Sequence, residues 1–480
     1  MRPLSPEMLR TEPKIGTEIV HAERSFSVHS PYSGEVIANV ADCGVREARL
    51  ALDAADEAYR SWSRITPFER AGVLMRWHDA IVEHAEELAS IMTLEMGKTI
   101  RESRGEVLGP TAGFVSWYAE EAKRGYGQVI PTHAERKRLF AFRKPIGPVL
   151  AITPWNFPAS MVTRKASAAL AAGCTVILKP AEQSPLSALL LGALWDEAGG
   201  PPGTLQIIPT SRPGDVTQAL IEDDRIRKVS FTGSTEVGRL VNGRAAMRLK
   251  KVSLELGGHA PFLVLADADV ERAVEQAIIA KFRNIGQSCV AANRLFVHDS
   301  IVGQFAQRYA EAAARLKVGD PTDEDTDIGP LVNDAAVEKV AEHVRDAVER
   351  GAQVLSGGRQ QGRVFHPTVL TSVHPEARIL NEETFGPIAP ITPFEDMNEA
   401  ISMANDVNYG LAAYVWTRSL SDAFHAIENL DYGIVGINDG VPAAPHVPFG
   451  GRKDSGFGKE GGHWGLDEYL ETTFASVQLP

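Results

Sequence analysis

The 480-residue sequence has few cysteines, and the three it has, Cys43, Cys174 and Cys289, lie far apart. They form no CxxC pair, and no Cys/His spacing typical of a zinc site is present. This pattern argues against a disulfide framework and against a bound metal. It is compatible with a reduced, cytoplasmic protein that uses a single reactive thiol.

Long apolar runs and an excess of positive charge are also missing. No stretch approaches the ~18 uninterrupted apolar residues of a membrane span, and the N-terminal MRPLSPEMLRTEPKIG lacks the apolar core of a signal peptide. The 49 Lys and Arg against 62 Asp and Glu give a net charge of −13, which opposes nucleic-acid binding. We therefore expect no membrane or nucleic-acid partner, although a few arginines could still form a local site for an anionic small molecule.

Strand-like and helix-like patterns alternate along most of the chain. Between residues 148 and 255, apolar runs such as PVLAIT, TVILKP and KVSFTG alternate with helical segments, and a second alternation begins at PFLVLAD. Such alternation predicts parallel sheets with helices on both faces. Residues 26–40 alternate with period two and predict a β-hairpin, whereas residues 45–107 have helical periodicity.

The sequence therefore predicts an α/β protein with more than one domain, since its length is about three times that of a typical ~150-residue domain. No repeat of 20–50 residues is present. The expected division places residues 1–122 and 146–254 in a cofactor-binding domain, residues 255–455 in a catalytic domain, and residues 123–145 and 456–480 in a strand-rich arm.

Two residues carry the most reactive chemistry in the sequence. Cys289 ends a polar turn in NIGQSC, and a thiolate is a natural nucleophile for a carbonyl carbon. Glu255 lies in the apolar segment VSLELGG, where burial would raise its pKa toward that of a useful general base. A small buried Cys and a surface Glu are the alternatives, and the occurrence of both motifs in one chain favours a catalytic pair.

Polar side chains also follow two of the predicted strands. In AITPWNFP, prolines on either side hold Asn156 rigidly, so its amide could donate to a developing oxyanion. In TVILKPAE, Lys179 and Glu182 follow a strand at the edge where doubly wound sheets bind ligands. Lys179 could contact ribose hydroxyls, and the Glu182 carboxylate would repel a 2′-phosphate, which favours NAD over NADP.

Two glycine motifs could bind phosphate. In KVSFTGSTEVG, a strand leads through Gly233 and Ser234 into a helix, which would bring backbone N–H groups to a phosphate. A literal GxGxxG stands at residues 456–461, but it follows a polar loop and the chain ends before a βαβ unit could form. We interpret residues 456–461 as a flexible loop near the substrate entrance.

Seven of these segments in order, PWNFP, LKPAE, FTGSTEVG, LELGG, GQSC, EETFGP and PFGG, make the chain resemble the aldehyde dehydrogenase superfamily. The segments MVTRKASAALAAGCTVILKPAE and KFRNIGQSCV are most similar to the succinate-semialdehyde dehydrogenases of that superfamily. The resemblance implies a Rossmann-like cofactor domain, an α/β catalytic domain and a small β arm that assembles a homodimer or homotetramer. It also implies NAD as the preferred cofactor, with NADP possible.

The resemblance assigns a role to each motif. Cys289 would attack the aldehyde, hydride would pass to NAD, and water activated by Glu255 would hydrolyse the thioester. Asn156 would form the oxyanion hole with the Cys289 backbone N–H. A carboxylate at position 255 distinguishes this chemistry from that of CoA-acylating relatives. The expected catalytic set is Cys289, Glu255, Asn156 and Lys179, and the expected cofactor residues are Thr153, Trp155, Lys179, Glu182, Gly233, Ser234, Glu383 and Phe385.

Substrate choice depends on three further residues. Arg164 and Arg283 match the arginines that bind the distal carboxylate in succinate-semialdehyde dehydrogenases, and two guanidinium groups would select an anionic tail. The loop VPAAPHVPFGG has His446 and lacks the serine that close succinate-semialdehyde dehydrogenases have, so His446 could serve a bulkier or differently charged tail, such as that of a sulfonated or hydroxylated aldehyde. A glutarate-type or apolar aldehyde is a further alternative substrate. Position 290 is Val, so no second cysteine follows Cys289 to form a redox switch.

Overall fold

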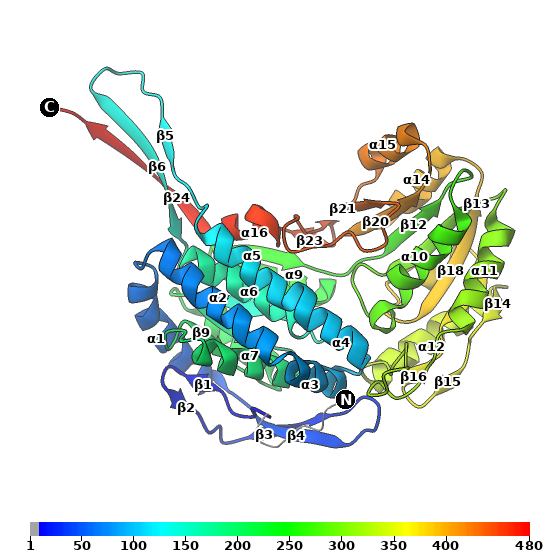
Figure 1. Ribbon diagram of the computed structural model, residues 1–480, viewed down its shortest axis with the longest axis horizontal. Helices are drawn as coiled ribbons and strands as arrows, with labels where there is room; N and C mark the ends of the chain where they lie inside the picture. The colour runs from blue at the N-terminus through cyan, green and yellow to red at the C-terminus, as the bar shows by residue number, and fades with distance from the viewer. Residues whose placement is uncertain (1–8) are drawn as a thin grey trace.

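A computed structural model describes residues 9–480 of the chain. The N-terminal part consists of two small hairpins followed by a layer of helices (Figure 1). The predicted hairpin and the predicted helical stretch are both confirmed. Local signals explain the boundaries: Thr66 and Glu69 form a capping box at the start of α2, and Gly97, at φ 88°, ends α3. These elements are β1 (Lys14–Ile15), β2 (Glu18–Ile19), β3 (Ser25–His29), β4 (Val36–Ala41), α1 (Val45–Trp62), α2 (Pro67–Glu83), α3 (Ala85–Met96), α4 (Ile100–Glu106), the π-helical η2 (Val107–Thr111) and α5 (Ala112–Ala122).

The first sheet has six strands in the order β23-β11-β10-β7-β8-β9, and its five strands β7 to β11 run parallel to one another. Its central strands are buried along their whole length, which explains their continuous apolar sequences. Its elements are β7 (Val149–Ile152), α6 (Ser160–Ala172), β8 (Val176–Lys179), α7 (Pro185–Glu197), β9 (Leu205–Ile207), α8 (Pro213–Glu222), β10 (Lys228–Thr232), α9 (Thr235–Ala246), β11 (Lys251–Glu255) and β23 (Gly456–Phe457).

The position of β23 corrects one expectation. Gly456 and Phe457 do not belong to a flexible loop, because they pair antiparallel with Glu255 and Leu254 at the edge of this sheet. A Cβ at position 456 would lie 2.1 Å from the Leu254 carbonyl oxygen, so the glycine is required by close strand packing. The GxGxxG segment therefore completes a sheet edge.

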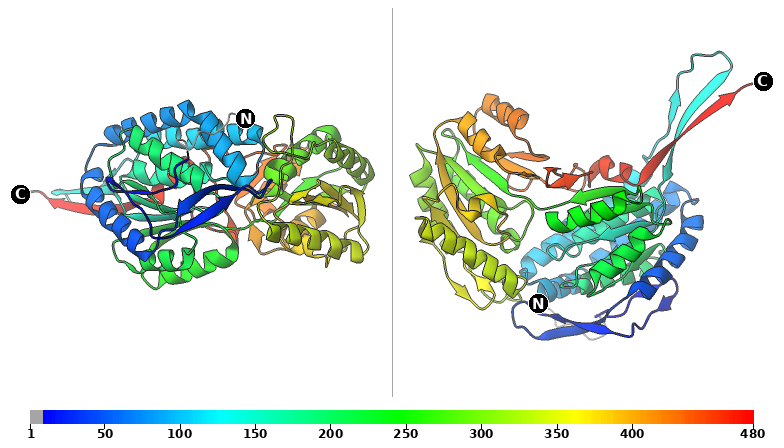
Figure 2. Two further views of the ribbon diagram at one scale, coloured as in Figure 1. Left: turned by 90° about the horizontal axis from the view of Figure 1, so that it is seen from below. Right: turned by 180° about the vertical axis from the view of Figure 1, so that it is seen from behind.

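The second sheet has seven strands in the order β14-β17-β18-β13-β12-β20-β21, again mostly parallel (Figure 2). The predicted second α/β alternation is confirmed. Its elements are β12 (Ala260–Val264), α10 (Val270–Phe282), the 3-10 turn η3 (Arg283–Gly286), β13 (Ala292–His298), α11 (Val302–Ala314), α12 (Asp334–Glu349), β14 (Gln353–Ser356), β17 (Thr368–Thr371), α13 (Arg378–Asn381), β18 (Ile388–Phe394), α14 (Met397–Asn405), β20 (Ala412–Trp416), α15 (Leu420–Asn429) and β21 (Ile434–Ile437), with the small pairs β15 (Gln360–Gln361), β16 (Val364–Phe365), β19 (Tyr409–Gly410) and β22 (Arg452–Lys453).

A three-stranded antiparallel sheet projects away from the rest of the molecule (Figures 1 and 2). It consists of β5 (Gln128–Ile130), β6 (Lys137–Pro145) and β24 (Leu470–Gln478). The short helix α16 (Gly462–Asp467), which precedes β24, packs on α5 and α6. Within residues 9–480, no helix is long and apolar enough to cross a membrane.

Candidate active site

A cavity of about 360 Å³ lies between the two larger sheets and receives side chains from both of them. From the first sheet come the loop after β7 and the segment between β10 and α9; from the second come the loop before β13 and the loop before β18. The structure brings seven of the predicted site residues to this cavity: Trp155, Asn156, Gly233, Ser234, Cys289, Glu383 and Phe385.

Cys289 lies between η3 and β13, with its side chain at the cavity. Burial raises the pKa of the thiol to about 12, the negative charges of Glu383 and Glu255 act in the same direction, and Arg164 opposes them. The other two thiols, Cys43 and Cys174, are fully buried, whereas Cys289 is partly exposed. Cys289 is therefore the cysteine that a small molecule can reach.

Asn156 is buried and lines the same cavity as Cys289. Its Nδ2 donates one hydrogen bond to the Gln287 carbonyl oxygen at 3.1 Å, and among the described residues its Oδ1 has no hydrogen-bond partner. An amide nitrogen has two hydrogens, so the second remains for an oxygen atom in the cavity. The geometry allows Asn156 to stabilise an oxyanion.

Glu255 ends β11 and is almost completely buried, although it does not line the cavity itself. Neither carboxylate oxygen has a hydrogen-bond partner among the described residues. Burial raises the pKa of Glu255 well above its usual value, and the charge of Glu460 raises it further, against the opposing charges of Lys165 and Arg164. Such a carboxyl can accept a proton near neutral pH.

Lys179, Glu182 and Thr153 lie at the carboxyl ends of β7 and β8, outside the cavity but on the same edge of the sheet. Lys179 Nζ is 3.1 Å from Glu182 Oε2, and the Thr153 N–H donates to the Lys179 carbonyl oxygen. Burial lowers the pKa of Lys179 against the charge of Glu182. Burial also raises the pKa of Glu182, but the ammonium of Lys179 and hydrogen bonds outweigh this effect and lower it.

Ser234 caps α9, because its Oγ accepts a hydrogen bond from the Val237 N–H at 3.3 Å. The helix comes close to β11, since a Cβ at Gly238 would lie 2.3 Å from Leu256. The uncompensated N–H groups at this helix start suit a phosphate. Trp155 and Phe385, which also line the cavity, meet edge to face with ring centres 5.5 Å apart. A phosphate-containing cofactor with a planar ring fits this set of groups.

Glu383 connects the loop before β18 to the turn that follows Glu255. Its Oε1 accepts a hydrogen bond from the Gly258 N–H at 2.9 Å. Burial raises the pKa of Glu383 to about 7, while that hydrogen bond and the nearby Lys339 lower it. Lys339, on α12, also lines the cavity and was missed, because a single Lys on an amphipathic helix carries no motif.

The three residues expected to bind substrate lie outside this cavity. The Arg164 guanidinium lies between the rings of Phe114 and Phe449, at 4.7 and 4.4 Å from their centres. It is 3.6 Å from the buried carboxylate of Glu460, a partner that no sequence motif indicated.

Arg283 is half-buried, 5.8 Å from the centre of the Phe157 ring, and lines a second pocket. His446 is exposed beside Trp117, with ring centres 5.9 Å apart. The two arginines therefore do not converge on the cavity that holds Cys289. Among residues 9–480, no group of His, Cys, Asp and Glu side chains is arranged to hold a metal ion.

Comparison with known proteins gives a consistent picture. The model of the aldehyde dehydrogenase family matches residues 19–475. A glutarate-semialdehyde dehydrogenase of Pseudomonas putida is 47% identical over 98% of this chain and 99% of its own length. An NADP-type succinate-semialdehyde dehydrogenase of Escherichia coli is also 47% identical, over 95% of both chains. Among solved structures, a succinate-semialdehyde dehydrogenase of Burkholderia pseudomallei is 43% identical, with a TM-score of 0.97 over 99% of both chains.

Proposed function

The chain belongs to the aldehyde dehydrogenase family and has its mixed α/β fold, and we propose that it oxidises a small dicarboxylic semialdehyde to the diacid with NAD(P)⁺. The observation that carries the proposal is the meeting of Cys289, Asn156 and Glu383 at one cavity. This arrangement offers a nucleophile, an oxyanion donor and a carboxylate for a cofactor hydroxyl.

In the first step, the sulfur of Cys289 attacks the carbonyl carbon and the carbonyl oxygen becomes an oxyanion. Because the pKa of the free thiol is raised to about 12, the thiol has to lose its proton to a base or to water as it reacts. The free hydrogen of the Asn156 amide and the Cys289 backbone N–H would stabilise the oxyanion.

The cofactor would be held by Lys179, Glu182, Ser234 and Glu383, with the rings of Trp155 and Phe385 lining the cavity next to it. When bound, NAD(P)⁺ would supply a hydride acceptor for the addition product, and Cys289 would then carry the acyl group as a thioester. Glu255 would then take a proton from a water molecule, and that water would hydrolyse the thioester and release the acid. Its raised pKa suits this role, since a carboxylate of ordinary pKa would be a weaker base.

The anionic substrate class is supported by the relatives, which divide between succinate and glutarate semialdehyde enzymes. Arg164 supports it as well, because its buried Nε has no hydrogen-bond partner among the described residues and could bind a carboxylate, while Nη1 lies 3.6 Å from Glu460 Oε2. Arg164, Arg283 and His446 lie outside the cavity that holds Cys289. We propose that Arg164 and Arg283 bind the distal anionic group of the substrate beyond that cavity, and that His446 contacts a longer or bulkier tail.

We further propose that NAD is preferred over NADP. Glu182 is paired with Lys179 and has a lowered pKa, so it is ionised at neutral pH. A carboxylate at that position would accept from a ribose 2′-hydroxyl and repel a 2′-phosphate. For assembly, we propose that the projecting sheet mediates a dimer or tetramer, since Val129, Phe142 and Phe474 expose apolar side chains on it.

A panel of aldehydes tests the proposal: succinic and glutaric semialdehyde, a sulfonated aldehyde, and aliphatic and aromatic aldehydes, each with NAD and with NADP. We expect the dicarboxylic semialdehydes to have the highest kcat/KM. Arg283→Ala should lose about tenfold or more on anionic aldehydes only. Arg308→Ala, which removes a half-exposed arginine on α11, is the matched control. Equal loss on apolar aldehydes, or none on anionic ones, would contradict the assignment of Arg283.

A further inference from the structure

The turn that leads to Cys289 has an unusual backbone. Asn284, Ile285 and Gly286 have φ angles of 53°, 63° and 71°, so three consecutive residues are left-handed. Only the last is a glycine, and an isoleucine in this region is costly because its branched Cβ crowds the backbone. Such a turn persists only where its surroundings hold it in place.

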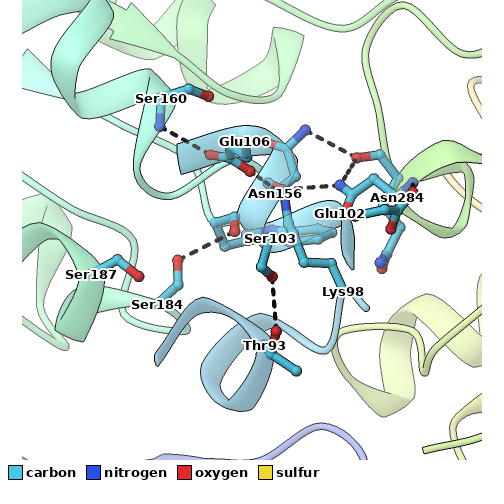
Figure 3. Close-up of polar contacts among 12 residues, drawn as sticks. Thr93, Lys98, Glu102, Ser103, Glu106, Asn156, Ser160, Ser184, Ser187 and Asn284 are labelled. Atoms are coloured by element: carbon cyan, nitrogen blue, oxygen red, sulfur yellow. Dashed lines mark hydrogen bonds and ion pairs between the residues drawn. The ribbon is translucent and has the colours of Figure 1, made fainter. Parts of the chain in front are cut away.

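Two neighbouring segments hold this turn in its left-handed conformation. Glu102, on α4, accepts a hydrogen bond from the Asn284 N–H at 2.7 Å (Figure 3). On the other side, Gly286 packs against the Gly386 carbonyl oxygen, where a Cβ would lie 2.3 Å from it. The turn is thus clamped between the helical layer and the loop that carries Glu383.

The side chain of Asn284 links this turn to Asn156 through hydrogen bonds. Its Nδ2 donates to the carbonyl oxygen of Asn156 and to that of Gln287, both at 3.0 Å. The Asn156 Nδ2 donates to the same Gln287 oxygen at 3.1 Å. Two buried amides therefore share one acceptor, two residues before Cys289, and Asn284 fixes both the backbone of Asn156 and the oxygen that orients its side chain.

We propose that Asn284, held by Glu102, is a positioning residue that keeps the Asn156 amide aimed at the oxyanion. The proposal rests on the proposed function, since it takes Asn156 as the oxyanion donor. Asn284 touches no reacting atom. Asn284 affects the reaction by positioning Asn156, and Glu102 affects it by positioning Asn284.

A double-mutant cycle tests this. The readout is transfer of the acetyl group of 4-nitrophenyl acetate to Cys289, which forms a thioester and releases 4-nitrophenolate without NAD(P)⁺ or a semialdehyde. We expect Asn156→Ala to slow it about 100-fold and Asn284→Ala about tenfold. In the Asn156→Ala background, Asn284→Ala should then cost less than about twofold, because the residue it positions is gone. A further tenfold loss in that background would overturn the proposal.

Glu102 gives a second comparison. Glu102→Ala should slow acetyl transfer, whereas Glu102→Gln, which keeps an oxygen acceptor, should retain most of the rate; equal loss in both variants would contradict the role assigned to Glu102. Asn405→Ala is the matched control, since that amide also bridges two backbone segments, at Asn429 and Asp431, and it should leave the rate unchanged.

The ester separates this proposal from the proposed function. A protein that is acylated by the ester but oxidises no semialdehyde would refute the proposed function and still allow the cycle to be completed. Ester turnover that persists in Cys289→Ser would overturn both, and thermal melting of each variant identifies any that fails to fold.

Discussion

Gly258 packs directly against the backbone of Cys289: a Cβ at position 258 would lie 2.1 Å from the Cys289 carbonyl oxygen. The Gly258 N–H also donates to Glu383 Oε1. One glycine therefore sets the spacing between the turn after Glu255, the nucleophile loop and the loop expected to hold the cofactor. The glycine is needed here for close approach, since its φ is not in the left-handed region.

Gly258→Ala should lower kcat about 100-fold or more, because the added methyl group has to displace the Cys289 backbone. Steady-state kinetics and the rate of Cys289 alkylation would measure the effect. Gly303→Ala, in α11, is the matched control: its Cβ would meet nothing within 4 Å. That variant should keep full activity and gain about 0.5–1 kcal/mol of stability. Normal turnover by Gly258→Ala would contradict this prediction, because it would show that the backbones of residues 258 and 289 can move apart without loss of activity.

Glu255→Gln should separate the two halves of the reaction. The thioester can still form on Cys289, but water activation is lost, so we expect a rapid burst of NAD(P)H followed by turnover slowed about 100-fold or more. Stopped-flow absorbance at the NAD(P)H band measures both phases. A variant with no burst would place Glu255 in the first half of the reaction, and one with an unchanged steady state would remove it from the mechanism.

The electrostatics of Glu255 predict a pH effect. If Glu255 is the base, as proposed, hydrolysis should speed up as the pH rises through its elevated pKa. Burial is the main cause of that elevation and the charge of Glu460 is the next, so Glu460→Gln should lower the pKa of Glu255. The rising limb of the kcat profile should then move to lower pH.

Glu468→Gln is the matched control for that shift, because Glu468 also pairs with a buried lysine, Lys228, at 2.9 Å and is not among the main charges that shift the pKa of Glu255. It should leave the limb in place. If the rising limb of Glu460→Gln moves to higher pH instead, the charge of Glu460 does not raise the pKa of Glu255.

Much of the fold was predictable because its signals are local. The apolar runs of β7, β8 and β10 mark strands buried on both faces, and capping by Thr66 marks a helix start. Asn156 could be selected because prolines hold the segment around it, and Cys289 because it ends a polar turn in a motif that resembles that of aldehyde dehydrogenases. The burial that raises the pKa of Glu255 was predictable from its apolar neighbours in sequence.

What could not be predicted depends on contacts between distant segments. Glu460 lies 205 positions from Glu255, yet its charge acts on that carboxyl. Glu102 meets Asn284 across 182 positions. The sequence pattern at residues 456–461 suggested a loop, because two residues are too few to show strand periodicity, and only pairing with β11 makes them a strand. Neither hydrophobic periodicity nor motif spacing indicates which distant residues pair in the fold.

The cofactor preference gives the last prediction. Replacing Glu182 by Ser removes the carboxylate that would repel a 2′-phosphate and leaves the Lys179 ammonium without its partner at 3.1 Å, so an attractive charge replaces a neutral pair. A change of about 1.4 kcal/mol in relative binding is tenfold, and we expect the ratio of kcat/KM for NADP to that for NAD to rise by at least that factor. Glu222→Gln, at an exposed position on α8, should leave the ratio unchanged. If the wild-type protein already prefers NADP tenfold, the ion pair does not exclude the phosphate, and Lys179 must bind it while Glu182 turns away.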